Sequence, residues 1–112
     1  MIIQGEAKLL RIFVGETDKI GSIPVYEKIV FLAKEKNLAG ATVYKGVMGF
    51  GRNSRIHSAK LLTISEDLPL VVEIVDTEEK ITSFIPLVNE VFDKSDSNGL
   101  FTVEKAEIIR YC

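Results

Sequence analysis

The stretch from Asp76 to Phe92 constrains the fold more than any other part of the chain, because its apolar residues recur at spacings of three and four. This spacing places them on one face of an α-helix. Asp76, followed three residues later by Glu79, approximates a capping box and predicts the start of the helix. We therefore expect a helix whose buried face consists of Ile81, Phe84, Ile85, Val88, Val91 and Phe92.

Strand-forming runs lie on both sides of this helix. The run before it, residues 68–76, is rich in β-branched residues, and residues 100–111 read as one long strand or two short ones. A polar turn over residues 93–99 separates the helix from this last strand. These elements form one strand–helix–strand unit.

The first half of the chain predicts a second unit of the same kind. Residues 7–14 and 41–48 read as strands. Between them we expect a helix with Ser22 as its N-cap and Pro24 in its first turn, ending at residues 37–40. A short strand at residues 61–64 would return from the loop that follows Met48.

The predicted order of elements is therefore βαββαβ. Two right-handed split units of this kind favour an α+β fold, a ferredoxin-like βαββαβ sandwich whose antiparallel sheet carries two helices on one face. Residues 1–112 would form this single domain. The other sheet face is left bare, and the chain is apolar for its size, with 46% hydrophobic residues and a mean hydropathy of +0.19. We therefore expect further copies of the chain to cover that face.

Charge and length exclude several classes of function. Sixteen acidic and 14 basic residues give a net charge of -2, which offers no footprint for nucleic acid. No apolar run approaches the ~20 residues of a membrane helix, so we expect no membrane insertion. Residues 1–6 become charged too soon for a secretory signal, which predicts a cytoplasmic protein. Cys112 is the only cysteine, so no intrachain disulfide can form.

A glycine-rich, basic segment occupies residues 46–60. Its basic residues are Arg52, Arg55, His57 and Lys60, and no Asp or Glu occurs between Gly46 and Ala59. Exposed backbone N–H groups and guanidinium groups suit phosphate or carboxylate oxygens, so the segment predicts an anion site. The alternative is a solvated hairpin connection that happens to be basic.

The run Gly49-Phe50-Gly51-Arg52-Asn53, placed at the end of a strand, resembles the Gly-Phe-Gly-Arg-Gln signature of PII nitrogen-regulatory signalling proteins. Residues 40–43 and 103–110 are similar to the start of the second PII strand and to its closing strand. Residues 65–69 and His57 extend the likeness to a PII-like branch of that family. The resemblance covers nearly the whole chain.

The resemblance implies a homotrimer that binds an adenine nucleotide in clefts between subunits and signals to a target protein through the loop, residues 50–60. Gly49, Gly51 and Arg52 would then meet the phosphates, and Thr42 the base or ribose. Asn53 takes the place of the family's glutamine, and Arg110 would come from the neighbouring subunit. The outer loop residues Arg55, His57 and Lys60 would meet the target.

One departure from the family concerns the turn at residues 93–99, which replaces a glycine- and lysine-rich phosphate loop. Asp93 and Asp96 would repel a triphosphate unless a cation such as Mg²⁺ bridged them. The basic loop contains no tyrosine, so modification of a loop tyrosine is not expected.

The sequence also argues against zinc chemistry, a catalytic triad and RNA binding. His57 is the only histidine and has no acidic neighbour in sequence, so neither zinc chemistry nor a catalytic triad is predicted, and no catalytic residue is assigned. The strand at residues 70–75 has no aromatic residue on which an RNA base could stack. Two alternatives stay open, a protein-interaction module or trimeric scaffold without a nucleotide, and more remotely an enzyme that uses Arg52, Arg55 and His57 on a phosphorylated substrate.

Overall fold

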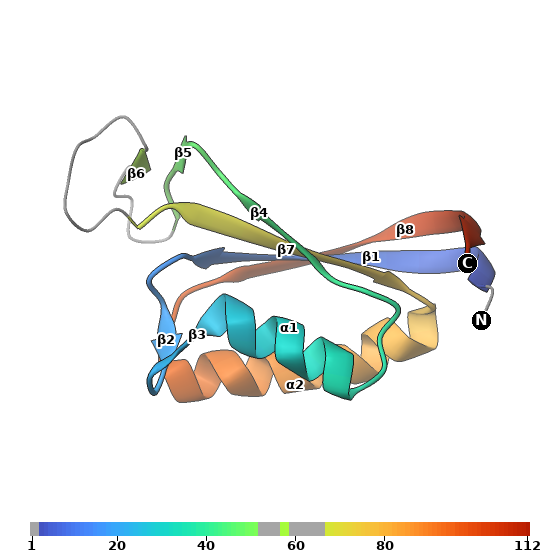
Figure 1. Ribbon diagram of the computed structural model, residues 1–112, viewed down its shortest axis with the longest axis horizontal. Coiled ribbons are helices and arrows are strands. Elements are labelled where there is room, and N and C mark those ends of the chain that lie inside the picture. The colour runs from blue at the N-terminus through green and yellow to red at the C-terminus, as the bar shows by residue number, and fades with distance from the viewer. Residues whose placement is uncertain (1–2, 52–56, 59–66) are drawn as a thin grey trace.

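The computed structural model describes residues 3–51, 57–58 and 67–112 (Figure 1). Along the chain the elements are β1 (Ile3–Gly15), β2 (Lys19–Ile20), β3 (Ile23–Pro24), α1 (Val25–Glu35), β4 (Thr42–Lys45), β5 (Met48–Gly49), β6 (His57–Ser58), β7 (Pro69–Asp76), α2 (Glu78–Ser95) and β8 (Leu100–Tyr111). The predicted short strand at residues 61–64 lies outside the described residues.

Four strands form one antiparallel sheet in the order β4-β7-β1-β8. The first strand is therefore central, and the last strand lies at an edge. Figure 1 shows both helices on the same side of this sheet, and neither helix on its other side. The ferredoxin-like fold predicted from the order of elements is confirmed.

The core lies between the sheet and the helices and follows the alternation of the two central strands. Leu10, Ile12 and Val14 of β1 are buried, and so are the alternate residues of β7. From α2, five of the six predicted apolar residues are buried, and Ile85 packs against the core as a partly buried residue. The helical spacing therefore predicted the buried face of α2 correctly.

Both helices begin at a different residue from the one predicted. Ser22 is not the N-cap of α1, because it lies in the turn between β2 and β3 where Gly21 has a φ of +63°. Pro24 is the N-cap, and the first helical N–H, that of Val25, bonds the Asp18 carbonyl oxygen at 2.8 Å. The backbone carbonyl that precedes the β2–β3 hairpin therefore accepts this N–H in place of a side-chain cap.

In α2 the N-cap is Thr77 and not Asp76. The Thr77 hydroxyl accepts a hydrogen bond from the Lys80 N–H at 3.3 Å. Asp76 is the last residue of β7 and is buried, with 3% of its surface exposed. The helix also continues to Ser95, where Asp96 ends it in the left-handed conformation with a φ of 54°.

Candidate functional site

The glycine-rich segment after β4 packs closely on Pro69, the first residue of β7. The Gly46 N–H donates to the Pro69 carbonyl oxygen at 2.7 Å. A Cβ added at Gly46 would lie 2.9 Å from Cγ of Pro69, and one added at Gly49 would lie 3.2 Å from the same atom. A side chain at Gly46 would therefore force the proline ring to shift, and one at Gly49 would press on the same ring less severely.

Beyond this contact the chain forms a two-stranded hairpin. Met48 pairs with Ser58 and Gly49 pairs with His57. This places the backbone of His57 beside the run Gly49-Phe50-Gly51, which we call the glycine signature. Gly51 is exposed, and none of the described residues would lie within 4 Å of a Cβ at this position.

Three large apolar side chains project from this segment into solvent. Val47, Met48 and Phe50 have 75%, 58% and 69% of their surface exposed. Gly46 and Gly49 lie against Pro69, whereas these three side chains are exposed. A cluster of this kind in a single copy of a chain marks a contact surface.

Two carboxylates accept hydrogen bonds from backbone N–H groups near the end of β1 and the start of β7. The Asp67 carboxylate accepts the Thr17 N–H at 3.0 Å, and Asp18 accepts the Gly15 N–H at 3.0 Å. Burial raises the pKa of Asp18, the Gly15 N–H opposes this shift, and the charge of Asp67 adds to it. Two carboxylates therefore lie beside the Gly15–Pro69 pair, at the same strand end on which Gly46 and Gly49 pack.

The remaining predicted site residues divide into three groups. Thr42 is the first residue of β4, is exposed, and pairs with Glu73 in the middle of the sheet. Arg110 is exposed near the end of β8, where its Nε contacts the Cys112 sulfur at 3.3 Å. Arg52, Asn53, Arg55 and Lys60 lie outside the described residues.

A single copy of the chain keeps Arg110 far from the glycine signature. Tyr111 pairs with Ile3 at one end of β1, and Pro69, on which Gly46 and Gly49 pack, pairs with Gly15 at the other end. At about 3.3 Å per residue the strand between these pairs spans about 40 Å. Figure 1 shows β5 and the C-terminus at opposite ends of the long axis of the molecule, which is 45 Å in extent. The two groups cannot meet within one copy.

The turn after α2 is acidic, as its sequence indicated, and it lies at the same end of the long axis as β5 (Figure 1). Asp93 belongs to the last turn of the helix and Asp96 caps it. The carbonyl end of a helix carries negative partial charge, so both carboxylates add to an unfavourable field for phosphate. A phosphate near this turn would therefore meet two sources of negative charge, the carboxylates expected from the sequence and the carbonyl end of α2.

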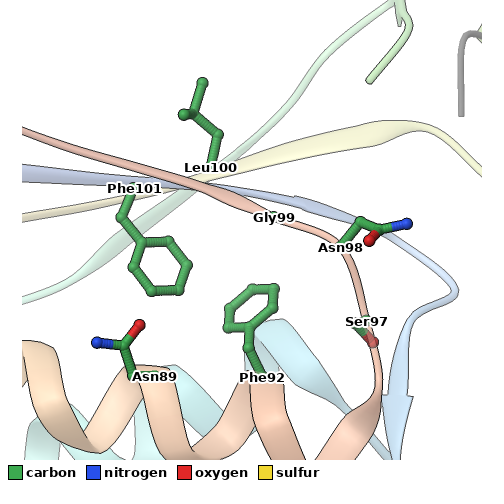
Figure 2. Close-up of a pocket in the computed structure, with 7 residues that line it drawn as sticks. All are labelled: Asn89, Phe92, Ser97, Asn98, Gly99, Leu100 and Phe101. Atoms are coloured by element: carbon green, nitrogen blue, oxygen red, sulfur yellow. The ribbon is translucent and has the colours of Figure 1, made fainter. Parts of the chain in front are cut away.

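An open cavity of about 370 Å³ adjoins this turn (Figure 2). Figure 2 shows Phe92, Phe101 and Asn89 directed toward one another between α2 and β8. The two phenyl rings meet edge to face with centroids 4.9 Å apart. Sequence reasoning missed this cavity, because it depends on how β8 crosses the end of the helix.

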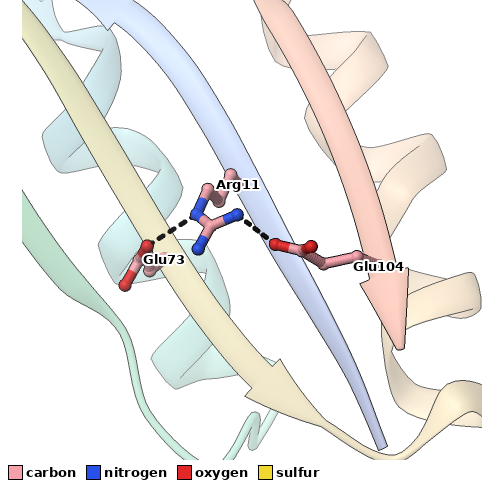
Figure 3. Close-up of polar contacts among 3 residues, drawn as sticks. All are labelled: Arg11, Glu73 and Glu104. Atoms are coloured by element: carbon pink, nitrogen blue, oxygen red, sulfur yellow. Dashed lines mark hydrogen bonds and ion pairs between the residues drawn. The ribbon is translucent and has the colours of Figure 1, made fainter. Parts of the chain in front are cut away.

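A charged cluster on the helix-free face of the sheet was also missed (Figure 3). Arg11 on β1 bonds Glu73 on β7 with an Nε–Oε2 distance of 2.8 Å, and its Nη1 bonds Glu104 on β8. A hydrogen bond from Arg11 holds the pKa of Glu73 below its usual range of about 4.5; burial opposes the shift, and the Tyr44 hydroxyl adds to it. Since the folded pKa is the lower one, this contribution to stability is present above about pH 4.5 and is lost as the pH falls below it.

Within the described ranges, no three His, Cys, Asp or Glu side chains gather so as to hold a metal ion. Among the same residues, neither helix is long and apolar enough to cross a membrane.

Comparison with known proteins gives consistent results at the level of sequence and of fold. The chain is 41% identical over 102 residues to a UPF0166 protein of Aquifex aeolicus, covering 91% of this chain and 92% of that protein. It is 32% identical over 105 residues to a UPF0166 protein of Methanocaldococcus jannaschii, covering 94% of each.

Among solved structures, the chain is similar to CPII, a nitrogen regulatory PII-like protein from Thiomonas intermedia K12, solved bound to ADP, AMP and bicarbonate. The TM-score is 0.70 at 16% identity, over 96% of this chain and 91% of CPII. This likeness shows a PII-like fold. The DUF190 family model, described as "Uncharacterized ACR, COG1993", matches residues 7–108, and the chain therefore belongs to the DUF190 (UPF0166) family.

Proposed function

We propose that this chain is a cytoplasmic, PII-like regulatory protein that binds an adenine nucleotide between the subunits of a homotrimer. Gly49, Gly51 and Arg52 would receive the phosphates, with Asn53 beside them and Thr42 at the base or ribose. The loop at residues 50–60 would signal to a target protein through Arg55, His57 and Lys60. The role is regulatory and not enzymatic.

The observation that carries this proposal is the separation of the two halves of the predicted site. Gly49 and Arg110 lie at opposite ends of a molecule that is 45 Å long. Among the described residues, the first half supplies the exposed backbone of Gly51 and the second half supplies one exposed cation, Arg110. A second copy that brings its Arg110 to the hairpin would complete the site.

The ligand is proposed from chemistry and from fold. The loop sequence is cationic and glycine-rich, which suits phosphate. The structurally similar CPII was solved bound to ADP, AMP and bicarbonate. The acidic turn at residues 93–99 favours a nucleotide with fewer phosphates, or one whose charge is bridged by Mg²⁺.

Replacing Arg52 by alanine should weaken nucleotide binding by about one to two orders of magnitude, because a charge-assisted hydrogen bond contributes roughly 1.5–3 kcal/mol. Calorimetry with ATP, ADP, AMP and cyclic nucleotides would measure the change. Arg55→Ala is the control variant and should change small-ligand affinity less. If Arg52→Ala binds each nucleotide as the wild type does, the phosphate role of this residue is wrong.

Subunit mixing tests whether the cleft lies between copies. Arg52→Ala and Arg110→Ala should each weaken binding. Trimers assembled from an equal mixture of the two variants should regain wild-type affinity at about a quarter of the sites, each with one intact loop and one intact Arg110. No recovery, in mixtures that native mass spectrometry shows to be mixed trimers, would contradict a shared site.

The exposed apolar cluster favours a second candidate function. Val47, Met48 and Phe50 form a surface suited to a protein partner, with the basic loop beside it in sequence. The chain would then be an interaction module or trimeric scaffold that needs no nucleotide. Calorimetry that finds no binding of any adenine nucleotide to the wild type would favour this alternative.

A further inference from the structure

The pairing of β8 with β1 is irregular at the point where β8 carries Arg110. Gly5 of β1 pairs with Ile108 of β8. The last pair joins Ile3 to Tyr111, so β8 advances by three residues while β1 advances by two. The two residues before Tyr111, of which Arg110 is the second, therefore oppose a single residue of β1. Arg110 lies in a β-bulge.

The backbone of Gly5 accommodates this bulge. Its φ is +108°, a value that residues with a Cβ rarely adopt. An extra residue in one strand reverses the alternation of its side chains relative to the other strand. The bulge therefore sets the direction of the Arg110 side chain, which the register of the rest of β8 would otherwise determine.

One side-chain contact holds the end of β8 beyond the bulge. The Tyr111 hydroxyl donates a hydrogen bond to the carbonyl oxygen of Ala39, in the segment between α1 and β4. Arg110 directly precedes Tyr111 in the chain. The contact therefore fixes the backbone from which the arginine side chain extends.

Ala39 is the fixed partner in this contact. Its own N–H donates to the buried Asp76 carboxylate at 2.8 Å. Two residues earlier, the Asn37 carbonyl oxygen accepts from Nζ of Lys80 at 3.3 Å. Loss of the Tyr111 hydroxyl would therefore release the end of β8 and leave the segment that leads into β4 in place.

The guanidinium of Arg110 can receive a ligand in this position. Its Nε contacts the Cys112 sulfur at 3.3 Å, and sulfur is a weak acceptor. The residue is exposed, and among the described residues its side chain has no other hydrogen bond or ion pair. The remaining N–H groups of the guanidinium can therefore bond an anion without first breaking a contact within the chain.

We infer that Tyr111 is a positioning residue of the proposed nucleotide site. Together with the bulge at Gly5, its hydroxyl presents Arg110 of the same copy to a nucleotide held by the hairpin of the neighbouring copy. The inference rests on the proposed function and adds a residue that acts through Arg110. A cation that is already held in place loses less conformational freedom on binding than a mobile one, so positioning contributes to affinity.

Tyr111→Phe keeps the ring and removes the hydroxyl. It should weaken the binding of ADP by about three- to tenfold, since the net contribution of one neutral hydrogen bond limits the effect. Arg110→Ala should weaken it further. Tyr26→Phe is the matched control, because it removes a hydroxyl from the first turn of α1, and it should bind ADP as the wild type does. Calorimetry of the full chain would measure each affinity.

Subunit mixing separates positioning from a general structural role. A mixture of Tyr111→Phe with Arg52→Ala should regain wild-type affinity at about a quarter of the sites, because the intact hairpin of one chain can meet the intact C-terminal end of the other. A mixture of Tyr111→Phe with Arg110→Ala should regain none, since both changes damage the same half of the site. Recovery in the second mixture, or none in the first, would overturn the inference.

Gly5→Ala tests the bulge. It should weaken ADP binding as Tyr111→Phe does, because alanine disfavours a φ of +108°. Gly21→Ala is its control, since that residue has a φ of +63° in the turn between β2 and β3, and it should leave ADP affinity unchanged.

The measured affinities distinguish two failures. If Tyr111→Phe binds ADP as the wild type does while Arg110→Ala binds weakly, the positioning by Tyr111 is wrong and the proposed function stands. If Arg110→Ala itself binds ADP with wild-type affinity, the proposed role of Arg110 is wrong, and the positioning by Tyr111 is wrong with it.

Discussion

Replacing Asp76 by alanine should lower the free energy of unfolding by about 2–5 kcal/mol, because it leaves two backbone donors without an acceptor. The buried Asp76 carboxylate accepts the Ala39 N–H at 2.8 Å and the Thr77 N–H at 2.7 Å. It thereby joins the end of β7 to the segment between α1 and β4 and to the start of α2. Urea denaturation followed by circular dichroism would measure the change.

Thr77→Ala is the matched control for this prediction. It removes the side-chain cap of α2, a single hydrogen bond to Lys80, and should cost about 1 kcal/mol. An Asp76→Ala variant no less stable than Thr77→Ala would show that the two N–H groups find other partners. The position of Thr42 depends on the same contact, because β4 begins three residues after Ala39.

Replacing Gly99 by valine should lower the free energy of unfolding by about 3 kcal/mol, as expected when a well-packed site is overfilled. A Cβ at this position would lie 2.4 Å from Cε1 of Phe92 and 3.1 Å from the backbone oxygen of Phe13. Moving the phenyl ring away from residue 99 would disturb its edge-to-face packing against Phe101. Thermal and urea unfolding would both report the loss.

Gly40 provides the control, because a Cβ there would meet no atom of the described residues within 4 Å. Gly40→Ala should leave stability unchanged or raise it by about 0.4–1 kcal/mol. If Phe92 causes the damage at residue 99, adding Phe92→Leu to Gly99→Val should cost less than the sum of the two single changes. An additive double variant would contradict this explanation.

The candidate site could be predicted from sequence only where its residues are neighbours along the chain. Gly49, Gly51 and Arg52 stand together in one short run, so the signature was visible without a structure. The close approach to Gly46 and Gly49 was not visible, because it comes from Pro69, twenty or more residues further on. The Arg11–Glu73–Glu104 cluster joins residues 62 and 93 positions apart and depends on strand register, which no local pattern determines.

The sequence by itself determined the type and order of the main elements and the buried face of α2, because periodicities of two and of three to four residues follow directly from strand and helix geometry. It did not determine where the helices begin. Ser22 was a suitable cap by residue type, but the β2–β3 hairpin provides the Asp18 carbonyl to Val25 instead. Asp76 was suitable as well, but its carboxylate is held by Ala39 across the fold. Only the tertiary structure decides such competitions, since the competing partners are brought together by packing between distant segments and not by local preference.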